Sequence, residues 1–322
     1  MGNIRREEAV IAVETRDHLS NGVSPKDHTS RRNNLNFSNM SKIATILIAI
    51  VVVFAFSSCE KDGVYHPKKK ISRIYEQPSG EPKDLSEKWV WDGKNLSKIL
   101  NRNETVYRTF KYEKNRISKI TWSDNEYFTF TFDGKHLKRV EYHGATDVLF
   151  TTWNFKYTKN KITTMTREEY DNKKSYTKDI TAALNLFLPV PTIQSMLEEE
   201  YPTSAKSSET AITYYDYEWD GDNIKKATVR YPNYDETVEI TYKYDKNNNP
   251  YYHFFENTVT SKNNIISSEG VGKYSYNGQT FPYSYTNDYE ITYEGKWPKE
   301  VLRVYRRPNY NPTRHTTYYE YE

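Results

Sequence analysis

One short pattern is read most clearly in Phe110-Lys-Tyr-Glu-Lys-Asn-Arg-Ile-Ser-Lys-Ile120. Two aromatic residues stand two positions apart, four turn-forming residues follow, and two apolar residues close the unit. Alternating residues, a polar turn and a second apolar run are typical of a β-hairpin. We therefore predict one antiparallel hairpin in this stretch.

The same eleven-residue unit recurs along the chain. The first four copies begin at residues 89, 110, 130 and 155, which are 21, 20 and 25 residues apart. This spacing accommodates a strand, a turn, a second strand and a return turn, so it indicates a repeat architecture. We predict a mainly β fold in which repeated β-hairpins form an antiparallel sheet. The copies span 89–99, 110–120, 130–140, 155–165 and 217–227, with a weaker copy at 291–301 and one at 242–250 that departs after its start.

Alternation within each strand assigns the two faces of the sheet. Phe128, Phe130 and Phe132 share one face, because side chains two apart in a strand point the same way. Thr129 and Thr131 share the other face. One aromatic and one polar face are typical of an antiparallel sheet that is packed on one side and wet on the other.

The turns are well marked, but the strands after them leave the register open. Asp-Gly at 92–93, 133–134 and 220–221 supplies turns that tolerate positive φ. The two apolar residues after each turn are three apart, as in Ile117 and Ile120, and strict alternation would place them on opposite faces. Either the first belongs to the turn, or each return strand carries a bulge that re-aims it.

The start of the chain has the pattern of an export signal. Residues 43–56 are nearly all apolar, follow the short basic start Ser41-Lys42, and lead into Phe56-Ser-Ser-Cys59. This is the layout of a signal peptide. Its last four residues resemble a bacterial lipobox, in which the cysteine is acylated and becomes the mature N-terminus. We predict a signal peptide at 40–58, lipidation of Cys59 and an outer-membrane location.

An uncleaved transmembrane anchor is the alternative, but the apolar run is shorter than the ~20 residues that a spanning helix needs. Residues 1–39 are expected to be untranslated or disordered, because export signals stand at the N-terminus. The cluster Glu60-Lys-Asp62 resembles the surface-export signal of Bacteroidota-type lipoproteins, which favours display on the cell surface over the periplasmic face. We predict a lipidated tether at 59–86 and a hairpin-repeat domain at 87–322.

The charge balance and the cysteine content limit which partners and which covalent cross-links are expected. The chain has 46 Lys and Arg residues against 43 Asp and Glu, a net charge of +3. No block of one sign is long enough for a basic stripe that binds nucleic acid, so no nucleic-acid partner is predicted. Cys59 is the only cysteine, which excludes an intramolecular disulfide.

The hairpin pattern stops between residues 165 and 214. Residues 179–201 are apolar in part but do not alternate, and Pro189-Val-Pro191 breaks them. Thr192 is a plausible N-cap for the residues that follow. We predict a short helical insert that covers a face or an end of the sheet.

A second interruption supplies the one candidate ligand site. Residues 251–255 read Tyr-Tyr-His-Phe-Phe, so their side chains point both ways from an extended backbone. Either the helical insert covers all five as core, or some of them are exposed. In the second case Tyr251 and Tyr252, with His253 as a hydrogen-bonding partner, form a stacking platform for a sugar or a peptide.

A search for catalytic motifs finds none. The histidines beyond Cys59 form no HxxxH or HExxH pair, and the sequence has no GxSxG motif and no P-loop. Asp220-Gly-Asp-Asn223 lacks the spacing of an EF-hand loop and is interpreted as a turn. We therefore predict no metal site, no cofactor and no catalytic residue.

The units resemble YD/RHS-type repeats, in which Tyr-Asp, a short turn and a hydrophobic return strand follow one another. The resemblance is carried by Trp91-Asp92, Phe132-Asp133, Trp219-Asp220 and Tyr244-Asp245. With the lipobox and tether, residues 40–322 are similar to Bacteroidota surface lipoproteins that have a β-rich domain of unknown function. This resemblance implies a β-rich domain without catalytic residues that could be carried over. Our leading interpretation is a non-enzymatic, lipid-anchored outer-membrane module that binds a glycan or a protein. A structural envelope subunit and a hydrolase with a site assembled only in three dimensions are the alternatives.

Overall fold

The computed structural model describes residues 64, 66–170, 211–232, 235–252, 260–276 and 278–322. The chain divides into two compact units, Met1–Ser58 and Cys59–Glu322. All of the described residues belong to the second unit. The predicted helical insert at 179–201 and the predicted signal peptide lie outside the described residues.

Sixteen β-strands make up the described part of the second unit. Their alternating sequences and the two-residue turns between many of them favour antiparallel hairpins over any helical alternative. The strands are β1 (Ile71–Pro78), β2 (Asp84–Asp92), β3 (Asn95–Leu100), β4 (Val106–Glu113), β5 (Arg116–Trp122), β6 (Tyr127–Asp133), β7 (His136–His143), β8 (Leu149–Thr158), β9 (Lys161–Glu169), β10 (Ala211–Asp220), β11 (Asn223–Tyr231), β12 (Glu236–Asn248), β13 (Asn263–Tyr276), β14 (Gln279–Glu294), β15 (Trp297–Arg306) and β16 (Thr313–Tyr321).

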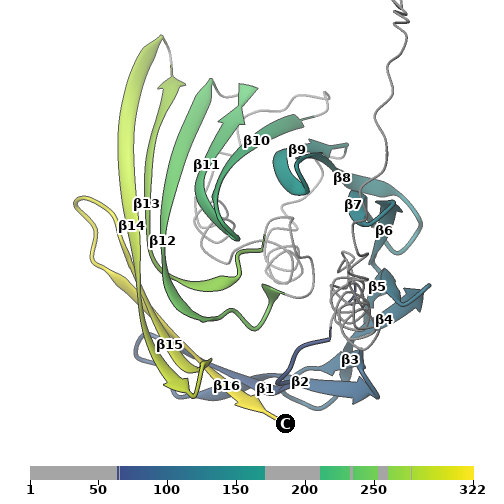
Figure 1. Ribbon diagram of the computed structural model, residues 1–322. Helices are drawn as coiled ribbons and strands as arrows, with labels where there is room; N and C mark the ends of the chain where they lie inside the picture. The colour runs from purple at the N-terminus through teal and green to yellow at the C-terminus, as the bar shows by residue number, and fades with distance from the viewer. Residues whose placement is uncertain (1–63, 65, 171–210, 233–234, 253–259, 277) are drawn as a thin grey trace, which may run out of the picture. The chain divides into compact units, whose positions relative to one another are not determined.

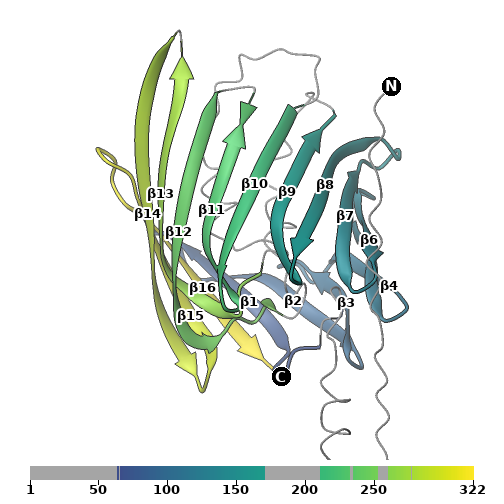
Figure 2. The ribbon, with the colours of Figure 1, turned by 45° about the horizontal axis from the view of Figure 1, so that its top comes forward.

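The strands form a closed antiparallel barrel in chain order, which confirms the predicted mainly β fold of repeated hairpins. Each strand pairs with the next, and β16 pairs with both β15 and β1 (Figure 1). The last strand therefore lies within a continuous wall and not at a sheet edge. Figure 2 shows β12, β13 and β14 as long neighbouring strands of this wall.

The barrel begins earlier than the sequence predicts. Residues 71–86, expected to belong to the tether, form β1 and the start of β2. The local sequence, with Pro78 and Pro82, is typical of a linker. β1 pairs with β2 on one side and, on the other, with Thr313–Tyr321, more than 230 residues further along the chain.

A bulge in each return strand settles the register. In β5, Lys119 pairs with Lys111 and Ile117 pairs with Tyr112, so Ser118 is an extra residue. This bulge brings Ile117 and Ile120 to the same face, which confirms the second of the two explanations above. The same extra residue occurs in five other hairpins, at Ser97, Lys138, Thr163, Lys225 and Lys299.

The turn chemistry is also as predicted. Gly93, Gly134 and Gly221 each have a φ of 56°, in the left-handed region that favours glycine. The 113–116 turn uses Lys114 and Asn115 instead, with φ of 50° and 63°, as a type I′ turn requires.

One face of the wall is buried and lines the interior of the barrel. On β12, Val238, Ile240 and Tyr242 are buried, while the alternate residues Glu239 and Thr241 are exposed. The buried face is the inner one, because a side chain that follows β12 reaches across to rings on β2 and β16, strands that do not adjoin β12. The core is therefore aromatic and aliphatic, as alternation predicts.

The outer face carries charged residues and threonines. Two cross-strand ion pairs illustrate it, Arg73 with Glu320 at 3.1 Å and Lys226 with Glu239 at 2.8 Å, and a third pair, Arg139 with Glu141 at 2.7 Å, lies within β7. Such exposed pairs contribute little to stability, at most about 1 kcal/mol each.

Candidate functional site

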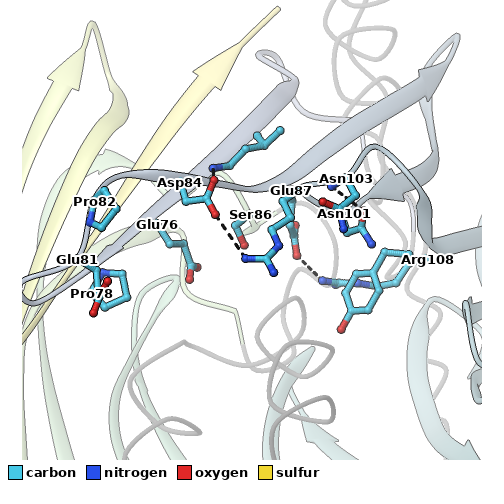
Figure 3. Close-up of a pocket in the computed structure, with 13 residues that line it drawn as sticks. Glu76, Pro78, Glu81, Pro82, Asp84, Ser86, Glu87, Asn101, Asn103 and Arg108 are labelled. Atoms are coloured by element: carbon cyan, nitrogen blue, oxygen red, sulfur yellow. Dashed lines mark hydrogen bonds and ion pairs between the residues drawn. The ribbon is translucent and has the colours of Figure 1, made fainter.

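A pocket of about 700 Å³ opens at the end of the barrel where β1 turns into β2 and β3 turns into β4. Figure 3 shows its polar side chains gathered around the pair Glu87 and Arg108. Its volume lies in the usual range for small-molecule sites, about 300–1,000 Å³. The lining residues are Glu76, Pro78, Glu81, Pro82, Asp84, Leu85, Ser86, Glu87, Asn101, Arg102, Asn103, Tyr107 and Arg108.

Two irregular bulges shape this pocket. On β2, Glu87 pairs with Ile74 and Leu85 pairs with Tyr75, which leaves Ser86 as an extra residue. On β4, Arg108 pairs with Ile99 and Val106 pairs with Leu100, which leaves Tyr107 as an extra residue. A bulge re-aims side chains that strict alternation would send to opposite faces. Consecutive residues of both strands therefore line one pocket.

Arg108 is the most buried polar residue of the pocket, with 1% of its surface exposed. Its Nη2 donates a hydrogen bond to Oε1 of Glu87, and Oε2 of Glu87 accepts a second from Nε1 of Trp89 at 2.7 Å. The Arg108 guanidinium also lies 4.9 Å from the ring centre of Tyr107. Within the described part of the chain, Nε and Nη1 of Arg108 have no hydrogen-bond partner. Two nitrogens of this pocket-lining guanidinium are thus buried without an acceptor among the described residues.

The rim of the pocket is polar and ordered by local bonds. Arg102 lies 3.7 Å from Asp84, and Asp84 accepts a hydrogen bond from the backbone N–H of Leu85 at 2.9 Å. Oδ1 of Asn101 accepts from the backbone N–H groups of Asn103 and Thr105, at 2.9 and 3.2 Å, which holds the β3–β4 turn. The side-chain amide of Asn103 is left at the exposed tip of this turn.

The pocket carries a net negative charge. Four carboxylates line it and two guanidinium groups oppose them, which leaves a balance of −2. Glu76 is in addition 3.4 Å from Nε2 of His315. The carboxylates and amides accept hydrogen bonds from hydroxyl groups, while Arg108 donates. The site can thus hold a small polar molecule that both donates and accepts.

The repeat itself contains a signal for this site, which the sequence analysis missed. The residue two before the first aromatic residue of a unit is Phe128, Trp153 or Tyr215 in three copies. The same position is Glu87 in the first copy and Arg108 in the second. These two charged residues lie on the face that is otherwise apolar. A charged pair in place of two core rings is a departure from the repeat of the kind expected at a functional site.

The residues that the sequence singled out lie elsewhere or outside the described part. Tyr251 is half-buried, its hydroxyl donates to the Tyr319 hydroxyl at 3.3 Å, and its ring centre is 6.4 Å from that of Trp89. Burial raises the pKa of Tyr251 well above its usual value. Tyr252 is also half-buried. His253 and Cys59 lie outside the described residues.

Tyr251 contacts a residue that holds the pocket in place, but it does not line the pocket itself. Its neighbour Trp89 is the residue that donates to Glu87, so the predicted platform and the pocket share one indole. No side chain of 251 or 252 is among the lining residues. The stacking platform therefore stays a prediction.

Among the described residues, none forms a helix long and apolar enough to cross a membrane.

Comparison with known proteins identifies similar folds only. No model of a protein family and no curated protein matches the sequence. A porin-like protein from Bacteroides uniformis ATCC 8492 is 10% identical, with a TM-score of 0.48 over 82% of this chain and 100% of that one. A porin-like protein from Bacteroides vulgatus ATCC 8482 is also 10% identical, with a TM-score of 0.46 over 79% and 99% of the two chains. A similarity this distant is no basis for assigning a function or a location to this chain.

Proposed function

We propose that the chain is a lipid-anchored protein of the outer membrane that faces the cell surface and binds a glycan or a protein. Its membrane partner is lipid, reached through an acylated Cys59. The observation that carries the binding role is the pocket around Glu87 and Arg108, where a charged pair with a buried arginine stands at repeat positions that hold core rings in other copies. Support for the anchor comes from the lipobox-like Phe56-Ser-Ser-Cys59.

The chemistry of the outer face supports an anchor over insertion of the barrel itself. Barrels that span a bilayer present an apolar band of about 25 Å to lipid and keep polar residues inside. Here the inner face is aromatic and the outer face carries Lys226, Glu239 and similar residues. Charged side chains at the centre of a bilayer cost about 2–4 kcal/mol each for Arg or Lys. The barrel is therefore suited to water on its outer face.

A hydrolase is the second candidate, because four carboxylates meet in the pocket. Hydrolysis by two carboxylates needs one acid and one base or nucleophile free to react. Both oxygens of Glu87 accept hydrogen bonds from Arg108 and Trp89, and Asp84 faces Arg102. These engagements favour binding over catalysis.

A structural subunit would need a large apolar surface to dock a partner. In the described part of the chain, the exposed large apolar residues are distributed over several strands and turns. They are Val106, Val148, Tyr170, Tyr214, Ile266, Val271, Tyr274, Phe281 and Tyr310. This distribution favours the binding module.

The anchor is tested by cutting the tether. A protease site is inserted after Asp62 in the full gene, the protein is produced in a host that processes lipoproteins, and the intact mass of the membrane-extracted form is taken. We expect a chain that starts at an acylated Cys59. We also expect protease treatment of washed membranes to release the barrel without detergent. Protease treatment of whole cells should release it too, because the proposed anchor displays the barrel on the cell surface. A barrel that stays in the membrane pellet after complete cleavage, or an unacylated start, would contradict the proposal.

A further inference from the structure

We infer that the pocket around Arg108 binds a neutral saccharide. This inference rests on the proposed binding function and names the site and the chemical class of its ligand. It starts from two donors of Arg108, Nε and Nη1, which are buried in the pocket wall and have no acceptor among the described residues. A buried donor without an acceptor costs about 1–3 kcal/mol, so a ligand oxygen at this point would be stabilising.

The charge around these donors excludes an anionic ligand. Arg108 is already neutralised by Glu87, and the pocket as a whole has a balance of −2. A carboxylate or sulfate would approach the carboxylates of Glu76, Glu81 and Asp84. The oxygen that accepts from Arg108 therefore belongs to an uncharged group, such as a hydroxyl, an ether or an amide carbonyl.

The other side chains of the pocket match a ligand with many hydroxyl groups. Glu76, Ser86 and Asn103 offer acceptors, and the amide and the hydroxyl also donate. A sugar hydroxyl donates and accepts, so it can use both kinds of partner at once. The ring of Tyr107, turned inward by its bulge, offers an apolar face for the C–H groups of a sugar.

A peptide fits less well than a saccharide. Extended peptides bind to β-proteins mostly by adding a strand to a free sheet edge. The barrel is closed through β1 and β16, so the described wall has no free edge to offer. A cationic peptide attracted to the carboxylates would also approach the positive charge of Arg102 at the rim.

The chain contains a matched control for Arg108. Arg167 is likewise an arginine of the inner face, with 17% of its side chain exposed; it is paired with Glu169 and lies 6.0 Å from the ring centre of Trp153. Arg108 is paired with Glu87 and lies 6.0 Å from the ring centre of Trp122. Arg167 does not line the pocket. Replacing either by lysine keeps the charge and removes the planar fork of donors.

The experiment applies the full-length, detergent-extracted protein to an array of neutral and acidic glycans, with trilysine as a competing cation. We expect wild type to bind neutral glycans, Arg108→Lys to bind at least ten-fold more weakly, and Arg167→Lys to bind as wild type. Ten-fold corresponds to the loss of about one hydrogen bond. Should Arg108→Lys fail to fold, Asn103→Ala at the exposed turn is expected to weaken binding several-fold.

Four outcomes would overturn the inference. They are no binding to any neutral glycan, binding confined to acidic glycans, displacement by trilysine, and equal binding by wild type and by the folded pocket variants. The intact mass of the same sample separates this failure from that of the proposed function. A protein acylated at Cys59 that binds no neutral glycan contradicts only the saccharide inference.

Discussion

The hydroxyl of Tyr112 donates a hydrogen bond of 2.9 Å to the backbone carbonyl of Leu96, and this bond joins one repeat hairpin to the preceding one. Leu96 comes directly before Ser97, the extra residue of its bulge. A bulge disrupts the ladder locally, so a side-chain donor at this point replaces part of what the ladder loses. Burial, the dominant effect, raises the pKa of Tyr112 above its usual value.

The same bond recurs around the barrel. In each case the polar atom of an aromatic side chain donates to a carbonyl that precedes a bulged residue. The four further pairs are Trp91 with Ile71 (2.8 Å), Trp219 with Ile162 (2.7 Å), Tyr244 with Ile224 (2.7 Å) and Tyr321 with Pro298 (2.8 Å). The repeat therefore uses Tyr and Trp because they combine a ring for the core with a donor for the neighbouring hairpin.

Removal of one such donor should be measurable. We expect Tyr112→Phe to lower the free energy of unfolding by about 1–2 kcal/mol, because the ring stays and the Leu96 carbonyl loses its partner. Chemical denaturation measures this loss. Tyr310→Phe, at a side chain that is 72% exposed, is the control and should change nothing. Equal losses in the two variants would show that the bond does not stabilise the fold.

The stability lost in each tryptophan variant should increase with the burial of its indole ring. Trp153 is 1% exposed, and we expect Trp153→Ala to cost about 3–5 kcal/mol. Trp91 is half-buried, so Trp91→Ala should cost less. Thermal melts of the full chain compare them. A larger loss for Trp91 than for Trp153 would contradict the assignment of the core.

Asp222 should make stability depend on pH. Hydrogen bonds from Lys161 at 2.9 Å and Lys262 at 3.2 Å, the first being the larger cause, lower the pKa of Asp222. A carboxylate with a lowered folded pKa stabilises the fold above its unfolded pKa of about 3.9 and stops doing so as pH falls through the folded value.

We therefore expect Asp222→Asn to cost less than about 1 kcal/mol at pH 7, since the carboxylate is 42% exposed. The difference from wild type should vanish in strong acid. Denaturation from pH 7 downward checks it, with Asp92→Asn, at the turn position that corresponds to Asp220, as a control. A difference that persists or grows in acid would contradict the ion pairs. In the 220–223 turn, the carboxylate of Asp222 thus forms ion pairs with the ammonium groups of Lys161 and Lys262.

The platform predicted at 251–255 can be separated from the core. The Tyr251 ring contacts Trp89 and Tyr319, so we expect Tyr251→Ala to destabilise the barrel by about 3 kcal/mol. Tyr252→Ala tests the platform itself, through thermal stability measured beside glycan binding. Unchanged melting with lost binding would support the stacking role of Tyr252. Unchanged melting with unchanged binding would remove it.

Much of the barrel follows from local sequence, and particular residues show why. The alternation of Phe128, Phe130 and Phe132 determines which face is core, because the side-chain period of a strand is two. Gly93 and Asn115 determine the turns, because few residues tolerate positive φ. The sequence also contained the anomaly of Glu87 and Arg108 at repeat positions that elsewhere hold rings, although a single copy does not reveal it.

Contacts between distant segments decided the rest. β1 reads as a linker, but it pairs with β2 on one side and with residues 313–321 on the other, and no local period encodes a partner as far along the chain as 313–321. The pocket depends on the extra residues Ser86 and Tyr107, whose positions are set by pairing between hairpins and not within them. The sequence by itself determined the hairpins, the faces and the turns, because those follow from backbone geometry over a few residues. Tertiary structure alone decided closure of the barrel and the meeting of Glu87 with Arg108 across β3, because register between hairpins is a non-local property.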